Sequence, residues 1–186
     1  MAKELIINSV ETFEEALPII RASQEEFSKF TQEQVDTICE HAAMAVSKMR
    51  IPLAKMANEE TGYGIVVDKI TKNQYASEHI WNYMRDAKTC GIIEENPEAG
   101  TKRVASPKGV IAAIVPTTNP TSTTIYKILI ALKTRNSIIV SPHPNAVNCT
   151  IEAARIMRNA AIAAGLPENV ISGVSVPSLE ISDVMM

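Results

Sequence analysis

Two short polar turns, each directly after an apolar run, hold the residues of this chain best suited to a ligand site. The first is Pro116–Pro120, with the sequence Pro-Thr-Thr-Asn-Pro, and the second is Ser141–Pro144, with the sequence Ser-Pro-His-Pro. A helical pattern follows the first turn at once, so backbone N–H groups and a helix dipole would face an anion bound there. The second turn puts a hydroxyl and an imidazole at the end of a strand. The carboxamide of Asn119 could also donate to a developing oxyanion, which makes this residue a candidate catalytic donor.

Both turns also have a purely structural interpretation. In the first turn, Thr and Asn are residues favoured at helix N-caps. In the second turn, two prolines would make a rigid strand-to-helix connection, and its residues alone favour this structural role over ligand binding. The chain has seven glycines and none within 116–124, so the glycine-rich phosphate loop of common dinucleotide-binding folds is absent. Ligand binding and plain capping therefore both remain open for the polar side chains of the first turn, which are Thr117, Thr118, Asn119, Thr121 and Ser122.

The cysteines and histidines give no independent catalytic or metal site. Cys39 falls on an apolar helical stripe and is expected in the core. Cys149 is expected in the first turn of a helix, where a thiolate is stabilised, but no base lies near it in the sequence. His41, His79 and His143 have no metal-ligand spacing, so no metal is expected.

The spacing of apolar residues predicts an α/β fold. Three short apolar runs read as strands and two amphipathic segments between them as helices, which gives a β-α-β-α-β order and a parallel sheet. The predicted strands are 110–115, 137–141 and 169–174, and the predicted helices are 121–133 and 146–164. The first strand is expected to be buried on both faces. In such folds ligands lie outside the carboxyl ends of the strands, where both polar turns fall.

A helical layer precedes this half of a doubly wound, Rossmann-like sheet. Residues 10–86 carry four helical patterns, including the capping box Thr31-x-x-Gln34, and 101–106 read as a short edge strand. We therefore divide the chain into an N-terminal segment, 1–106, and an incomplete nucleotide-binding domain, 107–186. In a sheet of order 3-2-1, strand 110–115 is an unpaired apolar edge, a feature that promotes association.

Composition narrows the range of partners. The net charge of −3 and the 4% aromatic content give no electrostatic or stacking footprint for nucleic acid. No apolar run reaches the length of a membrane span, and Met1–Glu4 do not open a signal peptide. Three cysteines fit a reducing compartment, so a cytoplasmic protein is expected.

The motifs together resemble those of CoA-acylating aldehyde dehydrogenases, and above all the N-terminal half of bifunctional aldehyde–alcohol dehydrogenases. The resemblance rests on the run 110–123, the segment 132–136 and Ser-Pro-His-Pro at 141–144, and it extends to 30–36, 50–56 and 88–91. It implies an aldehyde dehydrogenase-like fold and an oxidoreductase that interconverts an aldehyde and its acyl-CoA with NAD and CoA. In that family a cysteine thiolate attacks the aldehyde, hydride passes to the nicotinamide, and CoA resolves the thioester.

The resemblance also gives the two turns roles. Pro116, Thr117, Thr118 and Asn119 would lie beside the nicotinamide and the substrate oxygen. A gapless match to ordinary aldehyde dehydrogenases places their oxyanion asparagine on Thr118, one position before Asn119. The segment Ser141, Pro142 and His143 would border the adenosine of NAD or CoA.

The family's later glycine-rich loop, nucleophile domain and oligomerisation strand have no counterpart here, and no cysteine matches the nucleophile's motif. We therefore expect this chain to be a piece of a larger homo-oligomeric enzyme and to be inactive alone. Acetaldehyde is the favoured substrate, with succinate semialdehyde and sulfoacetaldehyde as alternatives, and NADP stays possible beside NAD. The competing hypotheses are a non-catalytic nucleotide-binding or assembly module and a fragment of a non-acylating aldehyde dehydrogenase.

Overall fold

A three-stranded parallel sheet lies at the centre of the chain. The computed structural model describes residues 5–186; residues 1–4, on which the expectation about a signal peptide partly rests, lie outside this range. The strands are β3 (Val110–Val115), β4 (Ser137–Pro142) and β5 (Ile171–Gly173), in the spatial order β3-β4-β5. Both pairs are parallel. The predicted β-α-β-α-β order and the 3-2-1 arrangement are confirmed.

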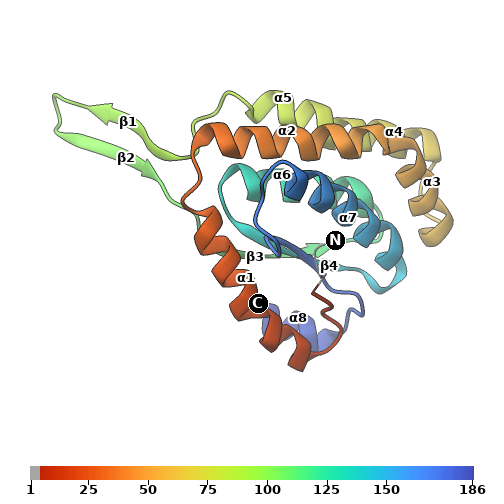
Figure 1. Ribbon diagram of the computed structural model, residues 1–186. Helices are drawn as coiled ribbons and strands as arrows, with labels where there is room; N and C mark the ends of the chain where they lie inside the picture. Colours follow the sequence, from red (N-terminus) through yellow and green to blue (C-terminus); the bar gives the residue numbers. More distant parts are fainter. Residues whose placement is uncertain (1–4) are drawn as a thin grey trace.

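Helices cover both faces of this sheet (Figure 1). The crossover helices are α6 (Pro120–Lys133) and α7 (Val147–Ala163), which is preceded by the 3₁₀ turn η2 (Pro144–Ala146). They lie on one face, and α1 (Val10–Phe27) and α8 (Leu179–Met185) lie on the other. Strand β4 shows why: Ile138 and Val140 enter one apolar core and Ile139 enters the second. All six residues of β4 are buried, as expected of a central parallel strand.

A second helical layer lies over α6 and α7 (Figure 1). Its elements are α2 (Gln32–Lys48), α3 (Arg50–Thr61), α4 (Val66–Gln74), the π-helical turn η1 (Tyr75–His79) and α5 (Ile80–Met84). The predicted capping box is present, with the Thr31 hydroxyl and the Gln34 side chain each accepting the other residue's backbone N–H. Among residues 5–186, none of the helices combines the length and apolarity that a membrane crossing needs.

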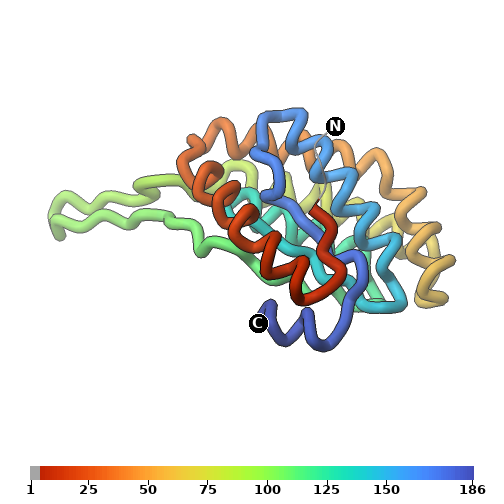
Figure 2. The backbone as a smooth tube through the Cα atoms, turned by 60° about the horizontal axis from the view of Figure 1, so that its bottom comes forward, coloured from red at the N-terminus to blue at the C-terminus, as the bar shows by residue number. Residues whose placement is uncertain are grey.

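A two-stranded antiparallel hairpin projects away from this body (Figure 2). It consists of β1 (Gly91–Asn96) and β2 (Thr101–Ala105). The sequence predicted the second strand but no strand at Gly91–Asn96. The reason is a register shift between Ile92 and Glu94, which breaks the alternation that marks a strand. The predicted edge strand therefore belongs to this hairpin and is separate from the parallel sheet.

Strand β3 is the outer strand of the parallel sheet, and its burial is only partial. Ala113 and Val115 are buried, whereas Ala112 is exposed and Ile114 is 45% exposed. The expectation of burial on both faces is wrong here, because no strand lies on the outer side of β3 among the described residues. The helical layer and the sheet share one apolar core, so the division at residue 106 stays a prediction about folding units.

A buried lysine connects the two layers. Lys133 at the end of α6 is 2% exposed and donates its ammonium protons to the Asp36 carboxylate of α2 and to the Arg85 carbonyl oxygen, 2.8 Å away. Its nitrogen also lies 5.6 Å from the ring centre of Trp81. A buried cation is tolerated only when its charge and its protons are satisfied, and these contacts do both.

Lys133→Met should therefore destabilise the fold. The change removes the ammonium from the partly exposed Asp36 carboxylate, which keeps the Gln32 amide as a donor, and from the Arg85 carbonyl oxygen, at a cost of about 2–4 kcal/mol in the free energy of unfolding. Urea denaturation measures this loss, with Lys29→Met, at an exposed position, as the matched control. The control should change the free energy by less than about 0.5 kcal/mol. An equally small effect at Lys133 would contradict the assigned role.

The open edge of β3 predicts self-association of the 186-residue chain when it is expressed alone. Its backbone groups offer a template for another strand, and a charge on the edge blocks such pairing. In sedimentation velocity, Ala112→Lys should shift the chain toward monomer, whereas Ala112→Val should not. A single monomeric boundary for the unmodified chain, with little binding of a hydrophobic dye, would contradict this prediction.

Candidate functional site

The two polar turns begin side by side at the carboxyl edge of the sheet. Val115, the last residue of β3, pairs in register with Pro142 at the end of β4. Parallel pairing thus places the start of the first turn, Pro116, against the second turn. This is the location at which doubly wound folds bind their ligands.

A cleft of about 380 Å³ opens at this edge, and we call it the strand-end cleft. It brings together four of the predicted site residues, which lie at or just after the ends of β3 and β4: Pro116, Ser141, Pro142 and His143. Residues 177–179 and 182, at the start of α8, complete its wall. Two of them also cap α8, because the Ser178 hydroxyl accepts the Ile181 N–H and the Ser182 hydroxyl donates to the Ser178 carbonyl oxygen. The polar side chains of this cleft are Ser141 and His143 from the second turn and Ser178 and Ser182 from the start of α8.

His143 is held in one orientation within this wall. Its Nδ1 accepts the backbone N–H of Asn145 at 3.1 Å, which caps the 3₁₀ turn η2. In the neutral ring the proton then resides on Nε2, which can donate to a ligand. Ser141 is buried at 3% exposure within β4, so its position is fixed by the sheet.

Asn119 at the end of the first turn lines a different cleft, whereas Thr117 and Thr118 line neither. Asn119 lines a hollow of about 460 Å³ between α4, η1 and α6, which we call the helix cleft. Lys72, Tyr75, Ser122 and Tyr126 are among its other lining residues. The structure thus separates Asn119 from the strand-end cleft, which the sequence did not predict.

The side chains of this turn divide between free and committed groups. Asn119 is the N-cap residue of α6, but its side chain makes no capping hydrogen bond, so the plain capping interpretation is wrong for it. Thr121 is unavailable for binding, because its buried hydroxyl donates to the Asn73 Oδ1 at 2.8 Å. Thr117 Oγ1 is buried without a hydrogen-bond partner, and Thr118 is exposed.

Two lysines of α4 converge on the same turn, and sequence reasoning missed both. Lys69 Nζ donates to the Thr118 carbonyl oxygen at 3.1 Å, and Lys72 Nζ donates to Asn119 Oδ1 at 3.0 Å. Their spacing of three residues puts both lysines on one face of α4. This spacing is the signal in the sequence that could have indicated a shared contact. The contacts themselves join residues 47 and 49 positions apart.

Positive charge therefore concentrates at the end of β3. Lys69 is 5% exposed, and burial, followed by repulsion from Lys72, lowers the pKa of its ammonium group. The amino end of α6 adds the positive end of a helix dipole. An oxygen that becomes negative during a reaction would be favoured here.

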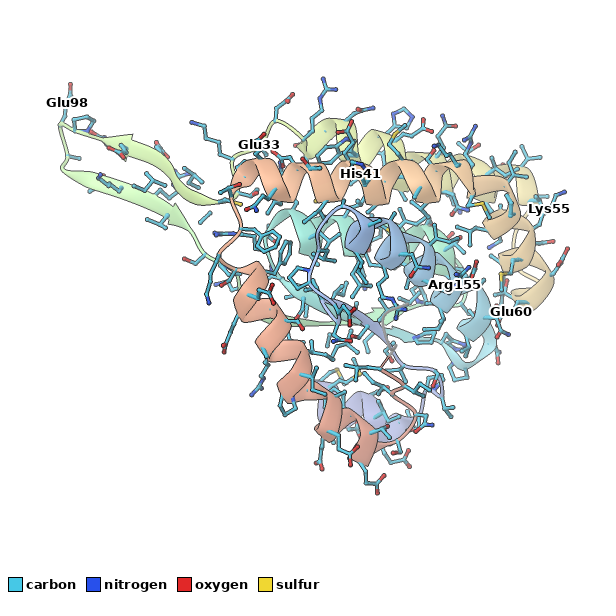
Figure 3. The ribbon with its side chains drawn as sticks, in the orientation of Figure 1. Glu33, His41, Lys55, Glu60, Glu98 and Arg155 are labelled. Carbon is cyan, nitrogen blue, oxygen red and sulfur yellow. The ribbon has the colours of Figure 1, made fainter. Side chains whose placement is uncertain are left out.

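Cys149 is not activated, contrary to what its place in the first turn of α7 suggested. It is fully buried, and this burial, with the neighbouring Glu60 carboxylate, raises the pKa of its thiol to about 12. Glu60 comes from the end of α3 (Figure 3) and accepts the backbone N–H groups of Asn148 and Cys149, both at 2.8 Å. The carboxylate thus occupies the helix terminus that would have stabilised a thiolate.

Cys39 lies in the core, as its place on an apolar helical stripe predicted. Burial there raises the pKa of its thiol. Among residues 5–186, no three side chains of His, Cys, Asp or Glu gather as metal ligands.

Known proteins resemble this chain over nearly all of its length. The model of the "Aldehyde dehydrogenase family" matches residues 6–186. The bifunctional aldehyde-alcohol dehydrogenase AdhE of Escherichia coli is 54% identical over 167 residues, which cover 90% of this chain and 19% of that protein. The aldehyde-alcohol dehydrogenase of Clostridium acetobutylicum is 50% identical over 180 residues, which cover 97% and 21%.

The fold agrees with these relatives. The crystal structure of an acetylating aldehyde dehydrogenase from Geobacillus thermoglucosidasius superposes with a TM-score of 0.92 at 43% identity, covering 94% of this chain and 39% of that one. The chain thus spans about a fifth of the bifunctional relatives and two fifths of this solved structure. The predicted fold class and the predicted resemblance are confirmed, and the chain belongs to the aldehyde dehydrogenase family, among relatives of the acylating type.

Proposed function

We propose that this chain is part of an enzyme that interconverts a small aldehyde and its acyl-CoA, with NAD as the redox partner and CoA as co-substrate. Acetaldehyde is the proposed aldehyde, because the relatives above include an acetylating enzyme and aldehyde-alcohol dehydrogenases. Succinate-semialdehyde and sulfoacetaldehyde dehydrogenases are also similar, at 38% and 39% identity, which keeps the aldehyde a proposal.

Two solved relatives support the proposed binding of CoA and of a nicotinamide cofactor. A propionaldehyde dehydrogenase from Rhodopseudomonas palustris, 27% identical with a TM-score of 0.80, was solved with bound CoA and an acylated cysteine. An engineered glycolyl-CoA reductase, 26% identical with the same TM-score, was solved with bound NADP⁺. We extend CoA binding and nicotinamide binding to this chain, and we propose NAD over NADP.

The observation that carries the proposal is that both polar turns leave the sheet at the carboxyl ends of β3 and β4, with the strand-end cleft at that edge and the helix cleft beside Asn119. The strand-end cleft, with Ser141, Pro142 and His143, would take the adenosine part of NAD or CoA. The turn from Pro116 to Asn119 would lie beside the nicotinamide and the reacting oxygen. Positive charge from α4 and α6 at that turn suits an oxygen that gains negative charge when a nucleophile adds to the carbonyl.

For the 186-residue chain alone we propose ligand contact without turnover. The reaction needs a reactive thiolate, and the thiols of Cys39 and Cys149 are buried with raised pKa values. Cys90, in the loop before β1, follows no nucleophile motif. We further propose that the complete enzyme is cytoplasmic and homo-oligomeric, and that it acts on neither nucleic acid nor membranes.

The activity is tested by NADH oxidation dependent on acetyl-CoA. We expect no turnover by the 186-residue chain and clear turnover by any longer reading frame that contains it. NADPH, succinyl-CoA and sulfoacetyl-CoA replace the two substrates in parallel assays and test the finer assignments. Activity in neither polypeptide would oppose the family function, and full activity in the short chain would overturn the proposal of a missing nucleophile.

The strand-end cleft is tested by His143→Ala in the active polypeptide. Loss of one hydrogen bond to bound cofactor should raise KM for NADH or CoA about 3- to 10-fold and leave kcat nearly unchanged. His41→Ala is the matched control, since this exposed histidine of α2 bonds the Thr37 carbonyl of its own helix. Unchanged KM values for both ligands would remove His143 from the proposed site.

A further inference from the structure

The contact between Lys72 and Asn119 joins, in the wall of the helix cleft, two elements that lie far apart in the sequence. Lys72 Nζ lies 3.0 Å from Asn119 Oδ1, and both residues line that cleft. We propose that Lys72 is a positioning residue, which orients the Asn119 carboxamide so that its N–H group faces the reacting oxygen. This inference rests on the proposed function and adds a residue to the machinery described there.

An ammonium group dictates the orientation of a carboxamide. It has three donors and no acceptor, so only the oxygen of Asn119 can face it. The amide nitrogen must then point to the other side, where it lies 3.4 Å from Thr118 Oγ1. That long contact occupies at most one of the two N–H bonds. The remaining N–H is a donor that a substrate oxygen in the helix cleft can accept from.

The ammonium also strengthens this donor. A positive group on the carbonyl oxygen draws electron density from the amide nitrogen, because hydrogen bonds in a chain polarise one another. The N–H on the opposite side therefore becomes a better donor to negative charge. This gain is largest when the accepting oxygen is an oxyanion, so it favours the transition state over the bound substrate.

Other contacts fix the backbone around Asn119, and Lys72 is the group that orients the Asn119 side chain. Lys69 fixes the Thr118 carbonyl, and the Asn119 carbonyl accepts the Thr123 N–H at the start of α6. The Asn119 side chain makes no capping bond that would orient it otherwise. Because Lys72 is exposed, its contact with Asn119 contributes little to the free energy of folding. Removing the Lys72 ammonium should therefore lower kcat and leave the stability of the fold nearly unchanged.

The test is a double-mutant cycle in the longest polypeptide that turns over acetyl-CoA and NADH. Lys72→Met should lower kcat about 10- to 100-fold with little change in KM, and Asn119→Ala should lower it at least as much. Lys72→Arg should restore most of kcat, because its guanidinium also only donates. In the Asn119→Ala background, Lys72→Met should have almost no further effect.

Lys55→Met is the matched control, because this lysine is exposed on the neighbouring α3 (Figure 3). It should keep the parent kcat. Additive losses in the cycle, or equal losses in the control, would overturn the proposal while the parent's activity upholds the family function. A raised KM with unchanged kcat for Lys72→Met would overturn it as well, since it would indicate substrate binding by the lysine.

A second measurement needs no turnover and separates this proposal from the proposed function. The side-chain amide resonances of Asn119 in the 186-residue chain report its hydrogen bonding directly. Lys72→Met should shift them, while Lys55→Met and Lys72→Arg should leave them close to their original positions. Unchanged resonances in Lys72→Met would contradict the proposal even if the enzyme proves active.

Discussion

The burial of β4 on both faces is the constraint on which the rest of the structure depends. Ile138 and Val140 require an apolar cover on one side and Ile139 requires one on the other, so α6 and α7 pack above the sheet and α1 and α8 below it. Parallel pairing with β3 follows from the crossover through α6, and it sets Val115 against Pro142. The candidate site is a consequence of that register, because both turns leave the sheet at the same edge.

The second helical layer gives the site its charge. An ion pair between the buried Lys133 and the partly exposed Asp36 holds α2 to α6, and the buried Thr121 hydroxyl donates to Asn73 at the end of α4. With α4 fixed in this way, Lys69 and Lys72 reach the turn after β3. Packing between layers thus converts an apolar strand end into a place that favours a negative oxygen.

The sequence alone predicted the strand order, the crossover helices and the two turns, because these follow from local patterns and from the resemblance to aldehyde dehydrogenases. It did not predict the hairpin partner Gly91–Asn96, since a bulge near Ile92 hides the alternation. It also missed the contact of Glu60 in α3 with the start of α7 and the contact of Lys72 in α4 with Asn119. Both contacts join residues that lie far apart in the sequence. The pKa of Cys149 could not be predicted from the sequence for the same reason. Its place at a helix terminus suggested a stabilised thiolate, but tertiary packing buries the thiol beside a carboxylate, which raises its pKa.

The account's central claim is that the turn Pro116–Asn119 serves the reacting oxygen and the nicotinamide, while Ser141–His143 serve adenosine. A crystal structure of the active polypeptide with NAD⁺ and CoA tests it most directly. We predict the nicotinamide against Pro116–Asn119, an adenosine in the strand-end cleft, and Asn119 Nδ2 or the neighbouring Thr118 facing the substrate oxygen. A cofactor bound away from the carboxyl edge of β3 and β4, with both clefts empty, would contradict the account.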